Sequence, residues 1–529
     1  MSFTSYTFIA FLGVMLLAYF LTYGKRQWIT LLVGSYIFYA FAGLDCLAFI
    51  LITTLSSYLV SRLLGRAIGR EKAFLEANKE TLDKAQRKEY KARSKKKRFR
   101  ILLCGLFFNF GILAVLKYSA FAVRNVNSII GLFGGKGFDV PSLLLPLGIS
   151  FYTFQTMGYL IDVYRGKVAP ERNIAKLALF VSFFPQLVQG PISLYSELAP
   201  SLYEPHKFDL KKFSFGMQRV IWGYFKKLVI ADRVLIAMNT MLDAPEQYGG
   251  AYVLLLIVLY SVQIYADFTG GIDITIGIAE SMGIKLAENF DRPFSSRSTK
   301  EYWRRWHITM GRWFREYIFV PIATVKPMLK LNNFCKNRIG VKAASKVVAY
   351  TASIVTWFVT GIWHGAAWNF IVWGLLNCLI IMVSESLEPL YKKFHARFPK
   401  LAGNRFYGGF CATRTFLLMG LIRSLDCYRN VATTFRMWGS MLTFRGIGEI
   451  LGGGILRLGL DLTDIVIILC GIAVMYAVSK ISAKTDVRES LYERPVLSAI
   501  LTCALLICVI MIGNYGIGYD ASQFIYDQF

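Results

Sequence analysis

Charged residues are scarce in this chain of 529 residues. They make up 18% of the sequence, whereas hydrophobic residues make up 55% and the mean hydropathy is +0.46. Apolar runs recur along nearly the whole length, which argues against a string of soluble domains. Lipid offers no partner to free backbone N–H and C=O groups, so such runs predict spanning helices. The sequence therefore predicts an all-α polytopic membrane protein.

Motifs for metal binding and for common hydrolytic chemistry are also missing. The nine cysteines show no C-x-x-C spacing, and several lie inside apolar runs. They are predicted to be small packing residues, so neither a metal site nor a disulfide is expected. There is no G-x-S-x-G elbow, H-E-x-x-H or Walker motif, which leaves hydrolase, zinc protease and ATPase functions unsupported. The first apolar run continues to Tyr23 without a small-residue cleavage pattern, so no cleavable signal peptide is expected.

Positive charge is in excess, with a formal net charge of +27. Segment 62–100 alone carries 15 Lys and Arg against 5 Asp and Glu. The positive-inside rule puts this basic loop and the pair Lys25-Arg26 in the cytoplasm, and two predicted spans lie between them. The N-terminus is therefore expected outside. Residues 71–93 contain neither Gly nor Pro, which predicts a solvated helix ending in Lys95 to Arg98 that contacts anionic membrane lipid rather than nucleic acid. The excess charge is also compatible with an anionic ligand.

The stretch 298–320 predicts one amphipathic helix at the bilayer interface. Ser298 followed by Glu301 is a capping-box start. At about 100° per residue, four arginines fall within an arc of roughly 100°. These are Arg304, Arg305, Arg312 and Arg315. The opposite arc holds Trp303, Trp306, Met310, Trp313, Phe314 and Tyr317. His307 lies at the edge of this aromatic face, where it is either incidental or functional.

A second histidine of interest, His364, follows 57 positions after His307 within the apolar region 347–383. An ionisable side chain in such a stretch is costly and is by default a functional candidate. A neutral imidazole in a dry site is suited to take a proton from a hydroxyl. The alternative is a core histidine bonded to a backbone carbonyl. His206 and His395 lie in polar segments and are predicted to be surface residues.

Polar residues also interrupt three other apolar segments. Residues 145–155 and 184–191 combine Pro and Gly with Gln, and residues 253–284 contain Gln263, Asp267 and Asp273. Such groups are expensive in lipid, which predicts broken or buried helices that line a cavity. Ordinary helix kinks are the alternative for the first two.

Several short blocks follow one another in an order and spacing that resemble the membrane-bound O-acyltransferases. The resemblance is strongest to the bacterial polysaccharide O-acetylation branch, typified by the alginate O-acetyltransferase membrane subunit. The blocks are Leu145 to Gln155, Ile161 to Arg165, Phe184 to Leu187, Lys226 to Asp232, Asp267 to Gly270, Glu288 to Phe290, Tyr302 to Ile308 and Gly361 to Asn369. The tail Phe524 to Phe529 also resembles this branch, with Asp527 where an aromatic residue is usual. Leu421 to Ser424 departs from the branch pattern.

The resemblance implies a single domain over residues 1–529. Its fold is a ring of about 11–13 transmembrane and re-entrant helices around a central tunnel, in a multi-pass protein of the bacterial cell membrane. It also implies that His364 is the catalytic histidine and His307 its second histidine. An acyl thioester enters from the cytoplasm and an acceptor hydroxyl arrives from the outer face. The expected product is an O-acetylated cell-surface or exopolysaccharide, made with a secreted or membrane-anchored partner of the SGNH type.

The expected mechanism has His364 as general base on the acceptor hydroxyl, while His307 orients the substrate or stabilises the oxyanion. No permanently bound cofactor is expected. Acetyl-CoA is the expected donor, and its phosphates suit the four arginines of segment 298–320. These arginines are equally suited to lipid headgroups. Two other functions stay open, namely D-alanyl transfer from a carrier protein toward teichoic acid and a non-enzymatic transporter.

Overall fold

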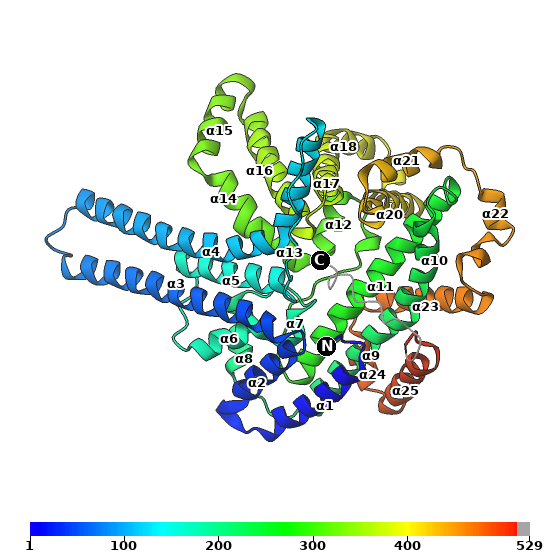
Figure 1. The fold of residues 1–529 in the computed structure, drawn as a ribbon, viewed down its shortest axis with the longest axis horizontal. Coiled ribbons are helices and arrows are strands. Elements are labelled where there is room, and N and C mark those ends of the chain that lie inside the picture. Colours follow the sequence, from blue (N-terminus) through cyan, green and yellow to red (C-terminus); the bar gives the residue numbers. More distant parts are fainter. Residues whose placement is uncertain (516–529) are drawn as a thin grey trace. The chain divides into compact units, whose positions relative to one another are not determined.

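The computed structural model describes residues 1–515, and this part of the chain contains helices but no strand (Figure 1). The predicted all-α class is therefore confirmed. Within these residues, seven helices are long and apolar enough to cross a membrane. They are α3 (Leu44–Ala77), α4 (Lys84–Leu132), α11 (Ala251–Ser281), α16 (Val341–His364), α17 (Trp368–Ser386), α23 (Leu462–Ile481) and α25 (Pro495–Ile512). The ring and its tunnel stay a prediction, and the tail block from Phe524 with Asp527 lies outside the described residues.

The chain forms two compact units. The first comprises Met1–Ser214 and Ile278–Leu286, and the second comprises Phe215–Gly277 and the chain from Ala287 onward. Besides α3 and α4, the first holds η1 (Gly24–Arg26), α1 (Tyr6–Leu21), α2 (Gln27–Ala40), α5 (Ile149–Arg165), α6 (Ile174–Ser182), α7 (Phe184–Leu187) and α8 (Tyr195–Tyr203). Helix α9 (Leu210–Tyr224) passes into the second unit, and α11 passes back.

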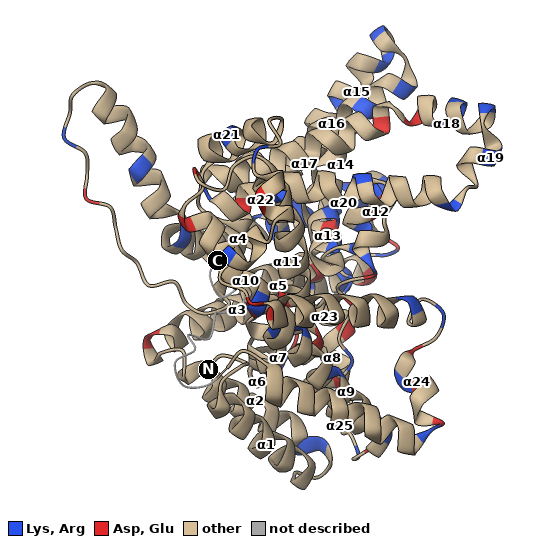
Figure 2. Ribbon diagram, turned by 90° about the vertical axis from the view of Figure 1, so that its right-hand side faces the viewer, with Lys and Arg blue, Asp and Glu red and all other residues tan. Residues whose placement is uncertain are grey.

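The second unit contains most of the short helices. They are the π-helix η2 (Phe225–Ala231), α10 (Asp232–Asp243), η3 (Pro293–Ser295), α12 (Thr299–Arg305), α13 (Ile308–Phe314), the π-helix η4 (Arg315–Phe319), α14 (Val320–Thr324), α15 (Lys326–Ile339), α18 (Glu388–Arg397), α19 (Pro399–Ala402), α20 (Arg405–Tyr428), α21 (Val431–Met441), α22 (Ile447–Leu451), η5 (Gly454–Leu458) and α24 (Val487–Tyr492). Figure 2 shows Lys and Arg on α15, α18 and α19, next to the ends of the largely uncharged α16 and α17. This is the distribution expected of polar connections between spanning helices.

The basic segment 62–100 is a helical hairpin rather than a loop. Helices α3 and α4 continue into it from either side and are joined by a short turn after Ala77. The continuous helix predicted over residues 71–93 is therefore wrong. Asp83 accepts from Gln86 N at 2.7 Å and Gln86 accepts from Asp83 N at 3.1 Å, a capping box that starts a new helix. Phe74 stacks on Tyr90 across the hairpin.

The polar residues of the two Pro- and Gly-containing interruptions of the first unit are buried, whereas a cavity lined by them stays a prediction. In α5, Gln155 donates from Nε2 to the carbonyl oxygen of Phe180 at 3.1 Å. Gln186 in the four-residue helix α7 and Gln189 just after it are 3% and 0% exposed. Such polar side chains inside a membrane protein need protein around them, so these short helices pack inside the unit.

Helices α9 and α11 approach each other closely in the second unit because glycine allows it. A Cβ atom on Gly223 would lie 2.5 Å from the carbonyl oxygen of Gly270, and a Cβ on Gly270 would lie 2.9 Å from that of Gly223. Any larger residue would push the two backbones apart. This contact brings the residues that follow Gly223 against the polar side of α11.

The π-helix η2 then directs two consecutive lysines to different carboxylates of α11. Lys226 Nζ lies 2.5 Å from Asp273, and Lys227 Nζ lies 2.6 Å from Asp267. Lys227 also pairs with Asp232 at 2.8 Å. All three carboxylates are paired with cations, which is how a charge is kept inside protein.

Candidate active site

The helix predicted over residues 298–320 is broken at Trp306 and His307. Ser298 caps α12 as predicted, accepting from Glu301 N at 3.2 Å, but α12 ends at Arg305 and α13 begins at Ile308. His307 has φ +48°, in the left-handed region that L-residues rarely adopt. The prediction of one continuous amphipathic helix is therefore wrong.

The break has a physical cause in the neighbouring segment, which pairs with it like a strand. Asp291 N donates to the carbonyl oxygen of Arg305 at 2.9 Å, and Ile308 N donates to that of Asn289 at 2.9 Å. An isolated antiparallel bridge joins Phe290 to Trp306. These two bonds give partners to backbone groups at the break, the Arg305 carbonyl and the Ile308 N–H.

Asn289 fixes the orientation of His307. Its Oδ1 accepts from Thr309 N at 3.1 Å and from Thr309 Oγ1 at 2.9 Å, and it lies 3.2 Å from His307 Nδ1. Because a backbone N–H can only donate, the Asn289 atom it contacts is the oxygen. His307 Nδ1 must therefore carry the proton, and the lone pair of the ring is on Nε2.

His307 is fully buried, with an exposed fraction of 0%. Burial, together with the positive charge of Arg423, lowers the pKa of His307 to about 3. Arg423 itself donates to the Tyr302 hydroxyl at 2.9 Å, and its guanidinium lies 3.9 Å from the Trp306 ring centre. The His307 imidazole is therefore neutral at physiological pH.

His364 is the last residue of α16 and is half-buried. Region 347–383 is thus two helices joined by a tight turn, with His364 at the turn. A Cβ atom on Gly361 would lie 2.5 Å from the carbonyl oxygen of Phe370, so glycine permits the close crossing of α16 and α17. The His364 ring centre lies 4.6 Å from that of Trp373. The ring is therefore held among aromatic side chains.

Trp363 brings the two candidate histidines together. Its ring centre lies 5.0 Å from that of His364 and 6.2 Å from that of His307. Phe268 of α11 covers another side of His307, with 4.9 Å between ring centres. Two histidines 57 positions apart in sequence thus share one indole as neighbour, as expected for a paired site.

The four arginines do not share the single face predicted for them. The break at His307 separates Arg304 and Arg305 on α12 from Arg312 and Arg315 beyond it. Arg304 and Arg315 are exposed, whereas Arg305 pairs with Glu301 at 2.8 Å. On the aromatic side, all predicted members except the half-buried Trp303 are buried, so this side packs against protein.

The remaining two histidines lie elsewhere. His395 is exposed and contacts the Tyr407 hydroxyl at 3.1 Å. His206 is half-buried and lies 3.0 Å from the Tyr19 hydroxyl through Nδ1, so its prediction as a plain surface residue is wrong. The cause is nonlocal, since the contact joins it to α1.

Asn289 and Arg423 are site residues that sequence reasoning did not select. Asn289 stands in a short resemblance block, Glu288 to Phe290, whose local pattern gives no chemical reason for an amide. Arg423 lies in the block Leu421 to Ser424, where the departure from the branch pattern concerns its neighbours and not the arginine. A buried cation beside a histidine becomes visible only when α20 is placed next to α12.

Comparison with known proteins finds one family model and several relatives named for acyl transfer. The family model described as MBOAT, membrane-bound O-acyltransferase family, matches residues 169–419, which include both candidate histidines. The probable alginate O-acetylase AlgI of Pseudomonas syringae pv. tomato is 31% identical over 84% of this chain and 76% of its own length. A peptidoglycan O-acetyltransferase of Helicobacter pylori is 32% identical over 57% of this chain and 58% of its own. A teichoic acid D-alanyltransferase of Bacillus subtilis is 27% identical over 48% and 62%.

Proposed function

The chain belongs to the membrane-bound O-acyltransferase family and is an O-acyltransferase, and from this premise we propose that it moves an acetyl group from a cytoplasmic thioester across the membrane to a hydroxyl acceptor. The observation that carries the proposal is the contact of both histidine rings with Trp363. A shared, water-poor aromatic site is where a thioester and a hydroxyl can react without hydrolysis.

The two histidines have different roles in this proposal. A base with a pKa near 3 is too weak to take a proton from an alcohol at neutral pH, so His364 is the general base. His307 donates from Nδ1 to Asn289, and its Nε2 is suited to accept a hydrogen bond from the acceptor hydroxyl. This tautomer favours the orienting role of His307 over donation to an oxyanion.

The proposed step balances without any further reagent. His364 takes the hydroxyl proton while the hydroxyl oxygen attacks the thioester carbonyl carbon. The tetrahedral intermediate collapses by breaking the C–S bond, and His364 returns the proton to the departing sulfur. The products are an O-acetyl ester and a free thiol, with His364 neutral again.

The proposed acceptor is a polysaccharide of the cell surface, reached directly or through a secreted SGNH-type partner. Two relatives are named as an alginate O-acetylase and a peptidoglycan O-acetyltransferase, and these names support a polysaccharide acceptor. The proposed location is the bacterial cell membrane, with the N-terminus outside. The family consists of transferases, which argues against a transporter function. D-alanyl transfer is the second candidate reaction after acetyl transfer, since the relatives named for D-alanyl transfer match a smaller share of the chain.

The donor is tested directly with purified protein. Acetyl-CoA should release free thiol at a rate that rises when alginate or peptidoglycan is offered as acceptor. Use of an acylated carrier protein with no use of acetyl-CoA would contradict this donor and favour D-alanyl transfer.

We propose that the exposed Arg304 and Arg315 contact the phosphates of acetyl-CoA. The double variant Arg304→Gln with Arg315→Gln should then raise KM for acetyl-CoA and make the reaction more salt-sensitive. Arg397→Gln, which removes another exposed arginine, is the matched control. An unchanged KM would assign the two arginines to lipid headgroups.

A further inference from the structure

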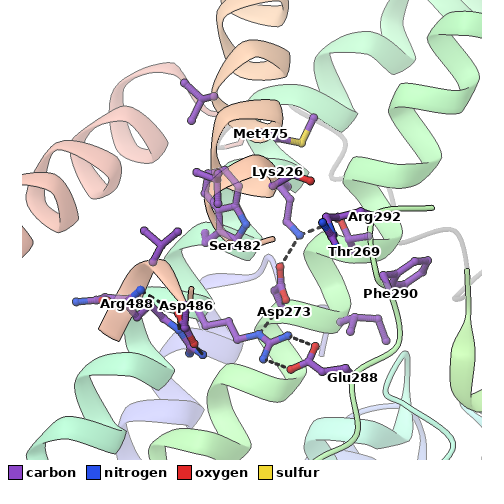
Figure 3. Close-up of a pocket in the computed structure, with 18 of the residues that line it drawn as sticks. Lys226, Thr269, Asp273, Glu288, Phe290, Arg292, Met475, Ser482, Asp486 and Arg488 are labelled. Carbon is purple, nitrogen blue, oxygen red and sulfur yellow. Dashed lines mark hydrogen bonds and ion pairs between the residues drawn. The ribbon is translucent and has the colours of Figure 1, made fainter. Parts of the chain in front are cut away.

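A cavity of about 730 Å³ lies within the second unit, apart from the indole shared by the histidines (Figure 3). Its walls come from α9 with η2, from α11, from segment 288–292 and from the α23–α24–α25 hairpin. This volume is typical of a site for a small organic ligand. The proposed acyl transfer assigns no role to it.

The charged residues that line the cavity are divided equally between cations and anions. The cations are Arg219, Lys226, Arg292 and Arg488, and the anions are Asp273, Glu288, Asp291 and Asp486. Asp273 pairs with both Lys226 and Arg219, and Arg219 in turn holds Glu288 at 2.6 Å. The formal charge of the lining is therefore zero. A polyanion such as coenzyme A would meet as many carboxylates as cations there.

Two ion pairs of the lining are more open than Lys226, whose side chain is 5% exposed. Arg292 lies 3.0 Å from Asp291, with side chains 35% and 53% exposed, and Arg488 lies 2.8 Å from Asp486, with 21% and 43% exposed. The second pair lies in the connection between α23 and α25. Burial raises the pKa of Asp486, but the hydrogen bonds and charge of Arg488 outweigh this and hold the pKa below its usual value. A ligand entering the cavity thus meets one guanidinium and one carboxylate side by side.

Two spanning helices line the cavity with apolar side chains. These are Val474 and Val478 of α23 and Leu501 and Leu505 of α25. Only 17% of the apolar window of α23 and 6% of that of α25 are buried inside the protein. The pair of Arg488 and Asp486 lies in the connection between these helices, where spanning segments end. The cavity therefore has the layout of a membrane lipid, with a polar head at the helix ends and an apolar part along them.

We propose that this cavity binds a zwitterionic phospholipid, of the phosphatidylethanolamine class. Its phosphate lies against Arg488, its ammonium against Asp486, and one acyl chain follows α23 and α25. An anionic lipid of the same chain length lacks the ammonium that complements Asp486, so it binds more weakly. Binding places the lipid against Phe290 and Ile308, which also line the cavity and flank Asn289 and His307.

The test is native mass spectrometry of the full chain in detergent, titrated with phosphatidylethanolamine and, separately, with phosphatidylglycerol carrying the same acyl chains. The wild type should prefer phosphatidylethanolamine by roughly tenfold in Kd. Leu505→Trp, which fills the cavity beside α25, should weaken phosphatidylethanolamine binding by roughly tenfold or more. Leu506→Trp is the matched control, because Leu506 is 42% exposed and does not line the cavity.

A separate double variant tests the ion pair of Arg488 and Asp486. Arg488→Gln with Asp486→Asn keeps the net charge and should remove the preference between the two lipids. Val478→Phe serves as a second filling variant if Leu505→Trp does not fold. Tighter binding of phosphatidylglycerol, or equal loss in Leu505→Trp and Leu506→Trp, would overturn the proposal. Displacement of the lipid by coenzyme A at similar concentration would also overturn it.

Discussion

At the scale of single residues, the side-chain amide of Asn289 sets the tautomer and the orientation of the His307 imidazole. Asn289 Oδ1 receives three polar contacts, from His307 Nδ1 and from both polar groups of Thr309. It therefore determines both the rotation of the His307 ring and which nitrogen holds the proton. Asn289 is a positioning residue in this account, since it acts through His307.

Asn289→Ala should lower kcat by about 10²-fold with little change in KM for the donor, because a misplaced orienting group costs rate rather than donor binding. Asn289→Asp keeps an acceptor at the same atom and should recover part of the loss. Thr309→Val, which removes only one of the three contacts, is the milder control. Equal losses in Asn289→Ala and Asn289→Asp would contradict the tautomer argument.

The lowered pKa of His307 also affects stability. Its pKa of about 3 in the fold lies below the usual 6.5, so protons favour the unfolded chain. The stability associated with neutral His307 is complete above about pH 6.5 and is lost progressively as the pH falls toward 3. Near pH 5 the loss amounts to about 2 kcal/mol.

This loss is measured by comparing wild type with His307→Gln, which does not titrate. The difference in unfolding free energy between the two proteins should narrow by about 2 kcal/mol between pH 7 and pH 5. The measurement is equilibrium unfolding followed by tryptophan fluorescence. A constant difference over this range would mean that His307 is not buried as described.

At the scale of elements, ion pairs hold the irregular helices together. Asp273 of α11 pairs with Lys226 of η2 and with Arg219 of α9, and it is only 15% exposed. Lys227 shares a fully buried position with Asp267 and Asp232. Buried pairs of this kind are costly to break, because one partner is left charged inside protein.

Asp273→Asn should therefore destabilise the protein by about 3–5 kcal/mol. Glu388→Gln is the matched control, since Glu388 pairs with Lys392 on the exposed surface of α18 and its loss should leave the unfolding midpoint nearly unchanged. Thermal unfolding of both variants in one detergent is the measurement. Similar midpoints for the two would show that the Asp273 pairs do not stabilise the fold.

Elements that depend on local pattern were predictable from sequence, and those that depend on distant partners were not. The Ser298 cap and the burial of the aromatic side chains of α13 follow from spacing alone. The break at His307 does not, because its cause is pairing with Asn289 and Asp291, outside the helix window. His364 was found as a costly residue in an apolar run and His307 at the edge of an aromatic face, but their common neighbour Trp363 needed the fold.

At the scale of the whole molecule, the positive-inside rule makes the proposed topology testable. Lys96 and Lys136 are both exposed. Lys96 lies in the N-terminal part of α4, a single spanning helix, and Lys136 lies just beyond its C-terminal end. The proposal puts Lys96 in the cytoplasm. After removal of accessible native cysteines, Lys96→Cys should resist impermeant thiol reagents in intact cells, and Lys136→Cys should react. The reversed pattern would contradict the orientation.

The central claim is that His364 is the base of an acyl transfer for which His307 only orients the acceptor. The measurement is the single-turnover rate of acetyl transfer by folded, monodisperse His364→Ala, with His395→Ala as the matched exposed-histidine control. His364→Ala should be slower than wild type by about 10² or more, and His395→Ala should equal wild type. An undiminished rate in folded His364→Ala would contradict the account.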